Sequence, residues 1–445
     1  MRRKFLLIPL VIVLVTALIF GGCAKPAEEV PEEILIGCVT SLTGPLAGAG
    51  GGSSWGLKAA VDDINKQGGV YVEEYGTKLP IKVVLVDSES TPAKFGTLAE
   101  DLILRDDVDV ITAAFEPPDF VAPLAVVAER YKVPHVSGAG PMEAWLGLRN
   151  EVTPPWKYTW AMGFSITTPA PPGDFRADNP GYLVMDNWLS ALGAYADETN
   201  KKVGAFAEDD PDGRGWYLGY TARASEEGYD ICGLDELLGL VPPATTDFTP
   251  LIQDWIDYDC DIIWGCSSAP FYGTLARQFN MMGFQPKMVF AAKSALFYTD
   301  IAAWGGDIPL GVSIEWWWNP GIKDSFGVGG TTPQSLYERY HEATGEPLNQ
   351  FIGVGYCVTQ VIADAIERAG TLDKDEINNA LGETDLMTIY HRIMFDKEDQ
   401  WHRCPISFGQ WQKVDKPEVW EAKIVFSYHD FIPVTGEFLF PIPYE

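Results

Sequence analysis

Apolar runs of strand length alternate with amphipathic segments of helix length along two stretches of this chain. In the first stretch, helical segments separate expected buried strands at 34–40, 81–86, 108–114 and 133–137. A second stretch repeats the pattern, with expected strands at 203–207, near Ile231, at 261–265 and at 287–291. Strand, helix and strand in succession predict a parallel sheet with helices on its faces, so we expect an α/β fold with two similar lobes.

The N-terminus has the pattern of an export signal. Arg2, Arg3 and Lys4 precede an uncharged run at 5–20, and Gly21-Gly22-Cys23 follows before an acidic, proline-rich stretch. A basic start, an apolar core and small residues before a cleavage point are typical of a secretory signal. We therefore expect a signal peptide at 1–22, lipidation of Cys23 and a flexible linker at 23–33. The alternative is a retained membrane anchor, although the run is shorter than the roughly 20 residues that span a bilayer.

Both N-terminal interpretations place the rest of the chain outside the cytoplasm, in the periplasm or on the outer face of the cell membrane. The formal net charge is -30, which makes nucleic acid an improbable partner. The cysteines after Cys23 are scattered, without a C-x-x-C motif, and their pairing cannot be assigned from the sequence. Cys38 and Cys357 lie in apolar patterns, where we expect buried free thiols.

Several segments resemble one family in the right order along the chain. The first strand and loop, 36–47, read IGCVTSLTGPLA; the next helix ends DDIN before Gly68-Gly69; and VPHVS at 133–137 and DGRG at 212–215 follow. These segments resemble the leucine/isoleucine/valine-binding proteins, the type I periplasmic binding proteins that serve ABC transporters. The resemblance implies two Rossmann-like lobes joined by a three-crossover hinge. The expected first lobe is 34–157 with 318–388, the second is 158–317 with 389–412, and 413–445 forms a C-terminal extension.

The resemblance also implies the function: a monomeric solute-binding protein that performs no chemistry, needs no cofactor or metal, and presents a small molecule to a permease. Its only contact with the membrane would be the lipid anchor. Ligands of such sheets collect at the carboxyl ends of the strands. The expected ligand-binding residues are Leu42, Thr43, Gly44, Phe115, Glu116, Asp119, Ala139, Gly140, Asp212, Ser267, Ser268 and Lys293.

Two departures from the family pattern bear on the ligand. The segment 115–120, FEPPDF, replaces a hydroxyl-bearing run that holds the ligand carboxylate in amino-acid-binding relatives, and Lys293 replaces an acidic residue that pairs with the ammonium. An acidic ligand without an ammonium therefore fits better than an amino acid. Glu116 and Asp119 complicate this preference unless they point away from the cleft or hold Lys293. At least one of Trp316, Trp317 and Trp318 is expected to reach the cleft or hinge, which would suit an aromatic or fatty acid.

Other functions find weaker support in the sequence. The glycine run 48–52 lies in a long loop expected before a helix capped by Ser53, and it fits a dinucleotide fingerprint poorly. Gly265-Cys266-Ser267-Ser268-Ala269 lacks the final glycine of a nucleophile elbow. His391, His402 and Cys404 have metal-ligating side chains, but a hairpin with surface histidines is favoured. The alternative functions are a sensory protein that partners a receptor and, third, an extracytoplasmic hydrolase.

Overall fold

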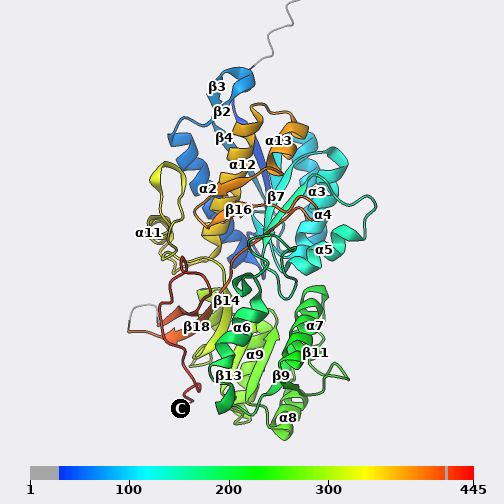
Figure 1. The fold of residues 1–445 in the computed structure, drawn as a ribbon, viewed down its shortest axis with the longest axis vertical. Helices are drawn as coiled ribbons and strands as arrows, with labels where there is room; N and C mark the ends of the chain where they lie inside the picture. The colour runs from blue at the N-terminus through cyan, green and yellow to red at the C-terminus, as the bar shows by residue number, and fades with distance from the viewer. Residues whose placement is uncertain (1–29, 416–418, 445) are drawn as a thin grey trace, which may run out of the picture.

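The computed structural model describes residues 30–415 and 419–444. Two α/β lobes lie one above the other along the longest axis, as Figure 1 shows. The predicted signal, Cys23 and most of the linker lie outside the described residues. Within the described part of the chain, no helix combines the length and apolar character that a membrane span requires.

The first lobe is built on a parallel sheet with strand order β17-β8-β7-β5-β1-β4, and β6 pairs with β7. Its strands are β1 (Ile34–Thr40), β4 (Ile81–Asp87), β5 (Val110–Thr112), β6 (Phe115–Glu116), β7 (His135–Ala139), β8 (Thr159–Gly163) and β17 (Trp401–Arg403). Its helices are α2 (Ala47–Lys66), α3 (Pro92–Arg105), α4 (Pro118–Tyr131), α5 (Met142–Asn150), α11 (Pro333–Thr344), α12 (Phe351–Ala369) and α13 (Lys374–Leu381). Two hairpins accompany this lobe, β2 (Val70–Val72) with β3 (Thr77–Leu79) and β15 (Asp385–Met387) with β16 (Arg392–Met394).

The second lobe contains a sheet with strand order β10-β9-β12-β13-β14-β18-β19, and β11 pairs with β9. Its strands are β9 (Lys202–Glu208), β10 (Asp230–Ile231), β11 (Leu240–Val241), β12 (Ile262–Cys266), β13 (Met288–Ala292), β14 (Val312–Trp316), β18 (Ser407–Lys413) and β19 (Trp420–Phe426). Its helices are α6 (Val184–Gly193), α7 (Pro211–Glu226), α8 (Thr249–Tyr258), α9 (Ala269–Met281) and α10 (Tyr298–Trp304). The α/β class with parallel sheets flanked by helices is thereby confirmed.

Three segments cross between the lobes: the stretch after β8, the stretch after β14, and the short link from β17 to β18. Two expected boundaries differ from this arrangement. Thr159–Gly163 pairs in parallel with β7, so the first lobe extends beyond residue 157. Trp401–Arg403 pairs with β8, so much of 389–412 belongs to the first lobe rather than the second. The expected C-terminal extension supplies β19, which pairs antiparallel with β18 at the edge of the second sheet.

Helix α2 begins at Ala47, not near Ser53, because the glycine run is helical. A Cβ built on Gly50 would lie 2.1 Å from the carbonyl oxygen of Ser41, and one built on Gly56 would lie 1.9 Å from that of Ile352. These glycines therefore let α2 pack against backbone, with α12 as its closest helical neighbour. The glycine run is a packing surface, which removes the structural basis of a dinucleotide loop.

Candidate functional site

A cavity of about 70 Å³ lies between the two lobes, at the carboxyl ends of several strands. Six of its eighteen lining residues are aromatic. The Phe115 ring stacks on Phe351 at 4.0 Å between centroids and meets Trp317 edge-on at 4.9 Å. The ring centroid of Phe164 lies 4.7 Å from that of Trp317 and 5.3 Å from that of Trp216. Such walls favour a flat or apolar solute, whose orientation a few polar groups would fix.

An ion pair between Lys293 and Asp212 stands inside this aromatic wall. Lys293 Nζ lies 2.8 Å from Asp212 Oδ2, and both residues line the cavity. Burial alone would lower the pKa of Lys293, but the charge of Asp212 and the acidic groups around it outweigh burial and raise the pKa. Lys293 therefore stays charged, and its backbone adopts a left-handed conformation directly after β13.

Further acidic groups surround the ion pair. The backbone N–H of Lys293 donates to Glu315 Oε1 at 3.3 Å, while Glu315 Oε2 and Asp212 Oδ1 are buried without a hydrogen-bond partner. Burial raises the pKa of Glu315 to about 8, so this carboxyl is largely protonated at neutral pH. Burial also raises the pKa of Asp300, another residue of the cavity wall, to about 6. The unpartnered oxygens are free for a ligand.

The residues predicted from the first loop hold the loop rather than line the cavity. Leu42 N–H donates to Asp87 Oδ1 at 3.0 Å, and Thr43 Oγ1 donates to Asp87 Oδ2 at 2.7 Å. Gly44 has a φ of 87° and packs tightly against Ser90. The loop that these contacts fix presents its next residues, Pro45 and Leu46, to the cavity.

Of the ligand-binding residues predicted in the segments 115–119 and 139–140, some line the cavity and others do not. Phe115 and Gly140 line the cavity, whereas Ala139 does not. Glu116 is fully buried and accepts hydrogen bonds from Thr40 Oγ1 at 2.8 Å and Ser41 N at 2.6 Å; burial raises its pKa to about 8. Burial and then the charge of Asp212 raise the pKa of Asp119 to about 6, against the opposing effect of Lys293.

Ser268 lines the cavity, and its N–H and hydroxyl both donate to Glu208, at 2.6 and 2.9 Å. Ser267 lies behind it, with its hydroxyl 3.0 Å from that of Ser294. None of the hydrogen bonds made by histidines of the described segments reaches Ser267. In this part of the chain, no histidine therefore pairs with Ser267 as the base of a nucleophile elbow does.

The three consecutive tryptophans face three different surroundings, because β14 ends at Trp316 and the chain then crosses between the lobes. Trp317 lines the interlobe cavity, and its backbone N–H donates to Gln350 Oε1 at 2.7 Å. Trp318 packs in the first lobe, where its indole N–H donates to the Ile389 carbonyl at 3.1 Å. Trp316 packs against Trp411 in the second lobe. Trp317 thus reaches the cleft.

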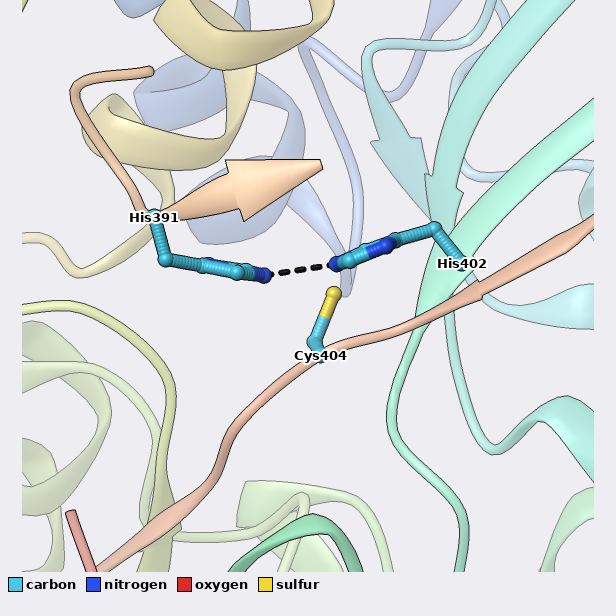
Figure 2. A group of neighbouring side chains, drawn as sticks. All are labelled: His391, His402 and Cys404. Atoms are coloured by element: carbon cyan, nitrogen blue, oxygen red, sulfur yellow. Dashed lines mark hydrogen bonds between the residues drawn. The ribbon is translucent and has the colours of Figure 1, made fainter. Parts of the chain in front are cut away.

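The expectation of surface histidines on a hairpin is wrong. His391, His402 and Cys404 are buried, and one potential ligand atom from each lies within 4.8 Å of the other two. Figure 2 shows the two rings end to end, with Nε2 atoms 2.7 Å apart and the Cys404 sulfur beside them. Three such donors in one place are the residues that could hold a thiophilic ion.

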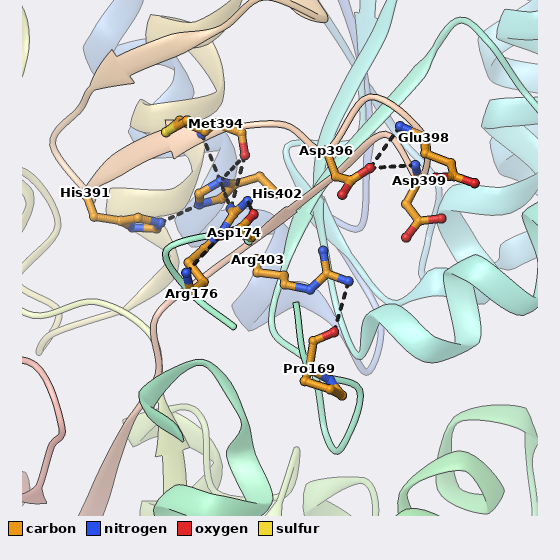
Figure 3. A network of polar contacts seen from close by, with 10 residues as sticks. All are labelled: Pro169, Asp174, Arg176, His391, Met394, Asp396, Glu398, Asp399, His402 and Arg403. Carbon is orange, nitrogen blue, oxygen red and sulfur yellow. Dashed lines mark hydrogen bonds and ion pairs between the residues drawn. The ribbon is translucent and has the colours of Figure 1, made fainter. Parts of the chain in front are cut away.

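The surroundings of His402 fit a hydrogen-bonded pair better than an ion. As Figure 3 shows, the Arg176 guanidinium donates to His402 Nδ1 at 3.1 Å, and the Met394 N–H donates to the same nitrogen at 3.0 Å. The Met394 carbonyl oxygen also lies 2.9 Å from Nδ1, but two N–H donors point at this nitrogen, which favours Nδ1 as the acceptor and a proton on Nε2 that is donated to His391. Arg403 also lies in this network, so a divalent ion would sit beside two guanidinium groups. The pair connects the residue just before β16 to β17, which precedes the third crossover.

The sequence missed most of the cavity wall. Glu315 lies at the carboxyl end of β14, where the rule used for the other strands could have found it. The aromatic residues gave no comparable signal, because they come from loops and helix starts scattered over the whole chain. The cavity residues not predicted include Phe164, Trp216, Phe297, Asp300, Glu315 and Phe351.

Comparison with known proteins adds four findings. The family model described as periplasmic binding protein matches residues 33–416. A Brucella suis protein named Leu/Ile/Val-binding protein homolog 7 is 25% identical over 95% of this chain and 96% of its own length. The structure of the leucine-binding protein LivK from Thermotoga maritima has a TM-score of 0.66 and 18% identity, covering 88% of this chain and 99% of its own. A Rhodopseudomonas palustris solute-binding protein, solved with 3,4-dihydroxybenzoic acid, has a TM-score of 0.65 and 19% identity, covering 93% and 99%.

Proposed function

This chain belongs to the periplasmic binding protein family, and we propose that it binds a small carboxylic acid with a flat, apolar body between its lobes. Its role is that of the extracytoplasmic solute-binding component of an ABC importer, which works with the permease of that transporter. The Lys293–Asp212 ion pair inside the aromatic cavity is the observation that carries the choice of ligand.

An incoming carboxylate would share Lys293 with Asp212. Glu315 supports this arrangement, because its protonated form can donate from the unpartnered Oε2 to the ligand. Asp119 and Asp300, whose pKa values are raised to about 6, would take up protons as the anion arrives. The phenyl and indole rings of the wall would enclose the body of the acid, and the benzoate-type ligand of the Rhodopseudomonas protein has this shape.

A second candidate is an amino acid, favoured by the same unpartnered oxygens. Asp212 Oδ1 and an ionised Glu315 Oε2 would accept hydrogen bonds from an ammonium group, and Lys293 would hold the carboxylate. The name of the Brucella relative points in this direction. The two candidates differ in their protonation requirements, since an acid needs the protonated Glu315 and an ammonium needs the ionised form.

Isothermal calorimetry against benzoate, 4-hydroxybenzoate, phenylacetate, leucine and phenylalanine tests the proposal. We expect an acid to bind the wild-type chain, and Lys293→Met to weaken it by about 100-fold through loss of a charge-assisted contact. Lys287→Met is the matched control, because Lys287 pairs with Asp261 at the opposite end of β13. Equal weakening by both substitutions, or binding of the amino acids alone, contradicts the proposed ligand class.

We further propose that the mature protein is a monomer anchored by a lipid on Cys23, that it binds without turnover and that it needs no cofactor. The sequence pattern around Cys23 supports the anchor. Metabolic labelling with a fatty acid, compared between wild type and Cys23→Ser, tests it: the label should follow the wild-type chain into the membrane fraction and be absent from the variant.

A further inference from the structure

A second cavity, of about 250 Å³, is lined by Trp316 at the end of β14 and by Asn319 in the crossover that follows. The second lobe contributes Trp316, Trp411 and Trp420 to its wall, and the first lobe contributes Tyr337 and Leu348. Tyr337 belongs to α11 and Trp411 to β18, two elements that Figure 1 shows on the same side of the molecule. The wall therefore includes residues of both lobes and of β19.

Two buried donors in this wall have no partner. The Gly321 N–H donates to Asn319 Oδ1 at 2.8 Å, which fixes the orientation of the amide and leaves Asn319 Nδ2 unpaired. The indole N–H of Trp316 is unpaired as well, whereas that of Trp411 donates to the Ala295 carbonyl at 2.7 Å. Asn319 is 6% exposed and Trp316 is 1% exposed, so both donors are costly to leave without an acceptor.

The charge of the cavity wall limits which kind of ligand could supply the hydrogen-bond acceptor. No lysine or arginine of the described ranges lines this cavity, while the carboxylate of Glu421 does. Glu421 is paired with Lys423 Nζ at 2.6 Å, so the described wall itself offers no cation to an anionic ligand, and a neutral oxygen acceptor fits better. Three indole rings favour a flat, apolar body.

We propose that this cavity is a second small-molecule site, distinct from the interlobe cavity, for a neutral flat molecule with a carbonyl oxygen. The carbonyl accepts hydrogen bonds from Asn319 Nδ2 and Trp316 Nε1, and the indoles enclose the rest. Because both lobes contribute to the wall, an occupant that fits one lobe arrangement better shifts the balance between arrangements.

Benzamide is a suitable probe, with benzoate and toluene as analogues that add a charge or remove the acceptor. The full mature chain is labelled with 5-fluorotryptophan, and the ¹⁹F resonances of Trp420 and Trp317 are assigned from Trp420→Phe and Trp317→Phe. Trp420 then reports the second cavity, and Trp317 reports the interlobe cavity. We expect benzamide to shift the Trp420 resonance saturably with a Kd of about 10 mM or tighter, and benzoate and toluene to do so more weakly.

Asn319→Asp is the decisive variant, because it keeps the acceptor for the Gly321 N–H and removes the unpaired donor. We expect Asn319→Asp to weaken the binding of benzamide by about 10-fold, and Trp316→Phe to weaken it by the same factor. Lys293→Met should leave the affinity for benzamide at this cavity unchanged. The proposal is overturned if benzamide shifts only Trp317, if the Trp420 resonance does not move, or if Asn319→Asp binds as tightly as wild type.

Discussion

Lys293 Nζ and Asp212 Oδ2 lie 2.8 Å apart in the cavity between the lobes. The two residues follow different strands of the second sheet: Asp212 lies in the first turn of α7, which follows β9, and Lys293 lies directly after β13. A charged pair in an aromatic wall is costly unless each charge keeps a partner. A ligand that enters the cavity therefore has to replace part of that pairing, which ties the chemistry of the ligand to these two side chains.

The pair predicts an asymmetry between single and double variants. Asp212→Asn should leave Lys293 without its counter-charge and so strengthen the binding of an anionic ligand. The double variant, Asp212→Asn with Lys293→Met, should bind the anion as weakly as Lys293→Met alone. Calorimetry on the three variants measures this coupling. Weaker binding of the acid to Asp212→Asn than to wild type would show that Asp212 itself contacts the ligand.

Glu116 predicts a pH dependence of stability. Burial raises its pKa from an ordinary 4.5 to about 8, so its stabilising effect is complete below pH 4.5 and is lost as the pH rises through about 8. Glu116→Gln keeps an acceptor for Ser41 N–H and cannot ionise. We expect the variant to gain at least about 1 kcal/mol over wild type at pH 9, and no such gain at pH 5, in urea unfolding. An equal difference at both pH values would contradict the buried, protonated carboxyl.

Two glycines of α2 should respond in opposite directions to alanine. Gly56→Ala would place a Cβ 1.9 Å from the Ile352 carbonyl oxygen and should destabilise the protein by about 1–3 kcal/mol. Gly51 has no atom within 4 Å of the same position, so Gly51→Ala should stabilise the helix by about 0.5–1 kcal/mol. Thermal unfolding of both variants measures the effect; a loss of stability in Gly51→Ala would show that the glycine run is not helical.

The buried histidine pair predicts a structural role without a metal. His402→Leu removes the acceptor of a charged Arg176 donor and should cost about 2 kcal/mol of stability. Dialysis against a chelator should leave the melting temperature of the wild-type chain unchanged. A stoichiometric ion in the purified protein, together with a lower melting temperature after chelation, would instead identify His391, His402 and Cys404 as its ligands.

The sequence was sufficient for the fold class because strand and helix periodicities are local. The lobe boundaries could not be predicted in the same way. Thr159–Gly163 is a short, mostly apolar stretch and Trp401–Arg403 is only three residues with two polar side chains, so only pairing with distant strands assigns them to the first sheet. In the cavity, the rule that ligands lie at strand ends found Phe115, Asp212 and Lys293. It could not find Phe297 or Phe351, whose rings reach the cavity only because the two lobes meet there.

The pH dependence of acid binding tests the central claim most directly. Calorimetry with benzoate, or with another acid of the panel that binds, is carried out at pH 6.5 and pH 9 in buffers of different ionisation enthalpy. The account predicts proton uptake on binding and an affinity at least about 10-fold tighter at pH 6.5, because Glu315 with a pKa of about 8 must be protonated. Proton release, or an affinity that rises with pH and is confined to amino acids, would contradict the account and assign Asp212 and Glu315 to an ammonium group.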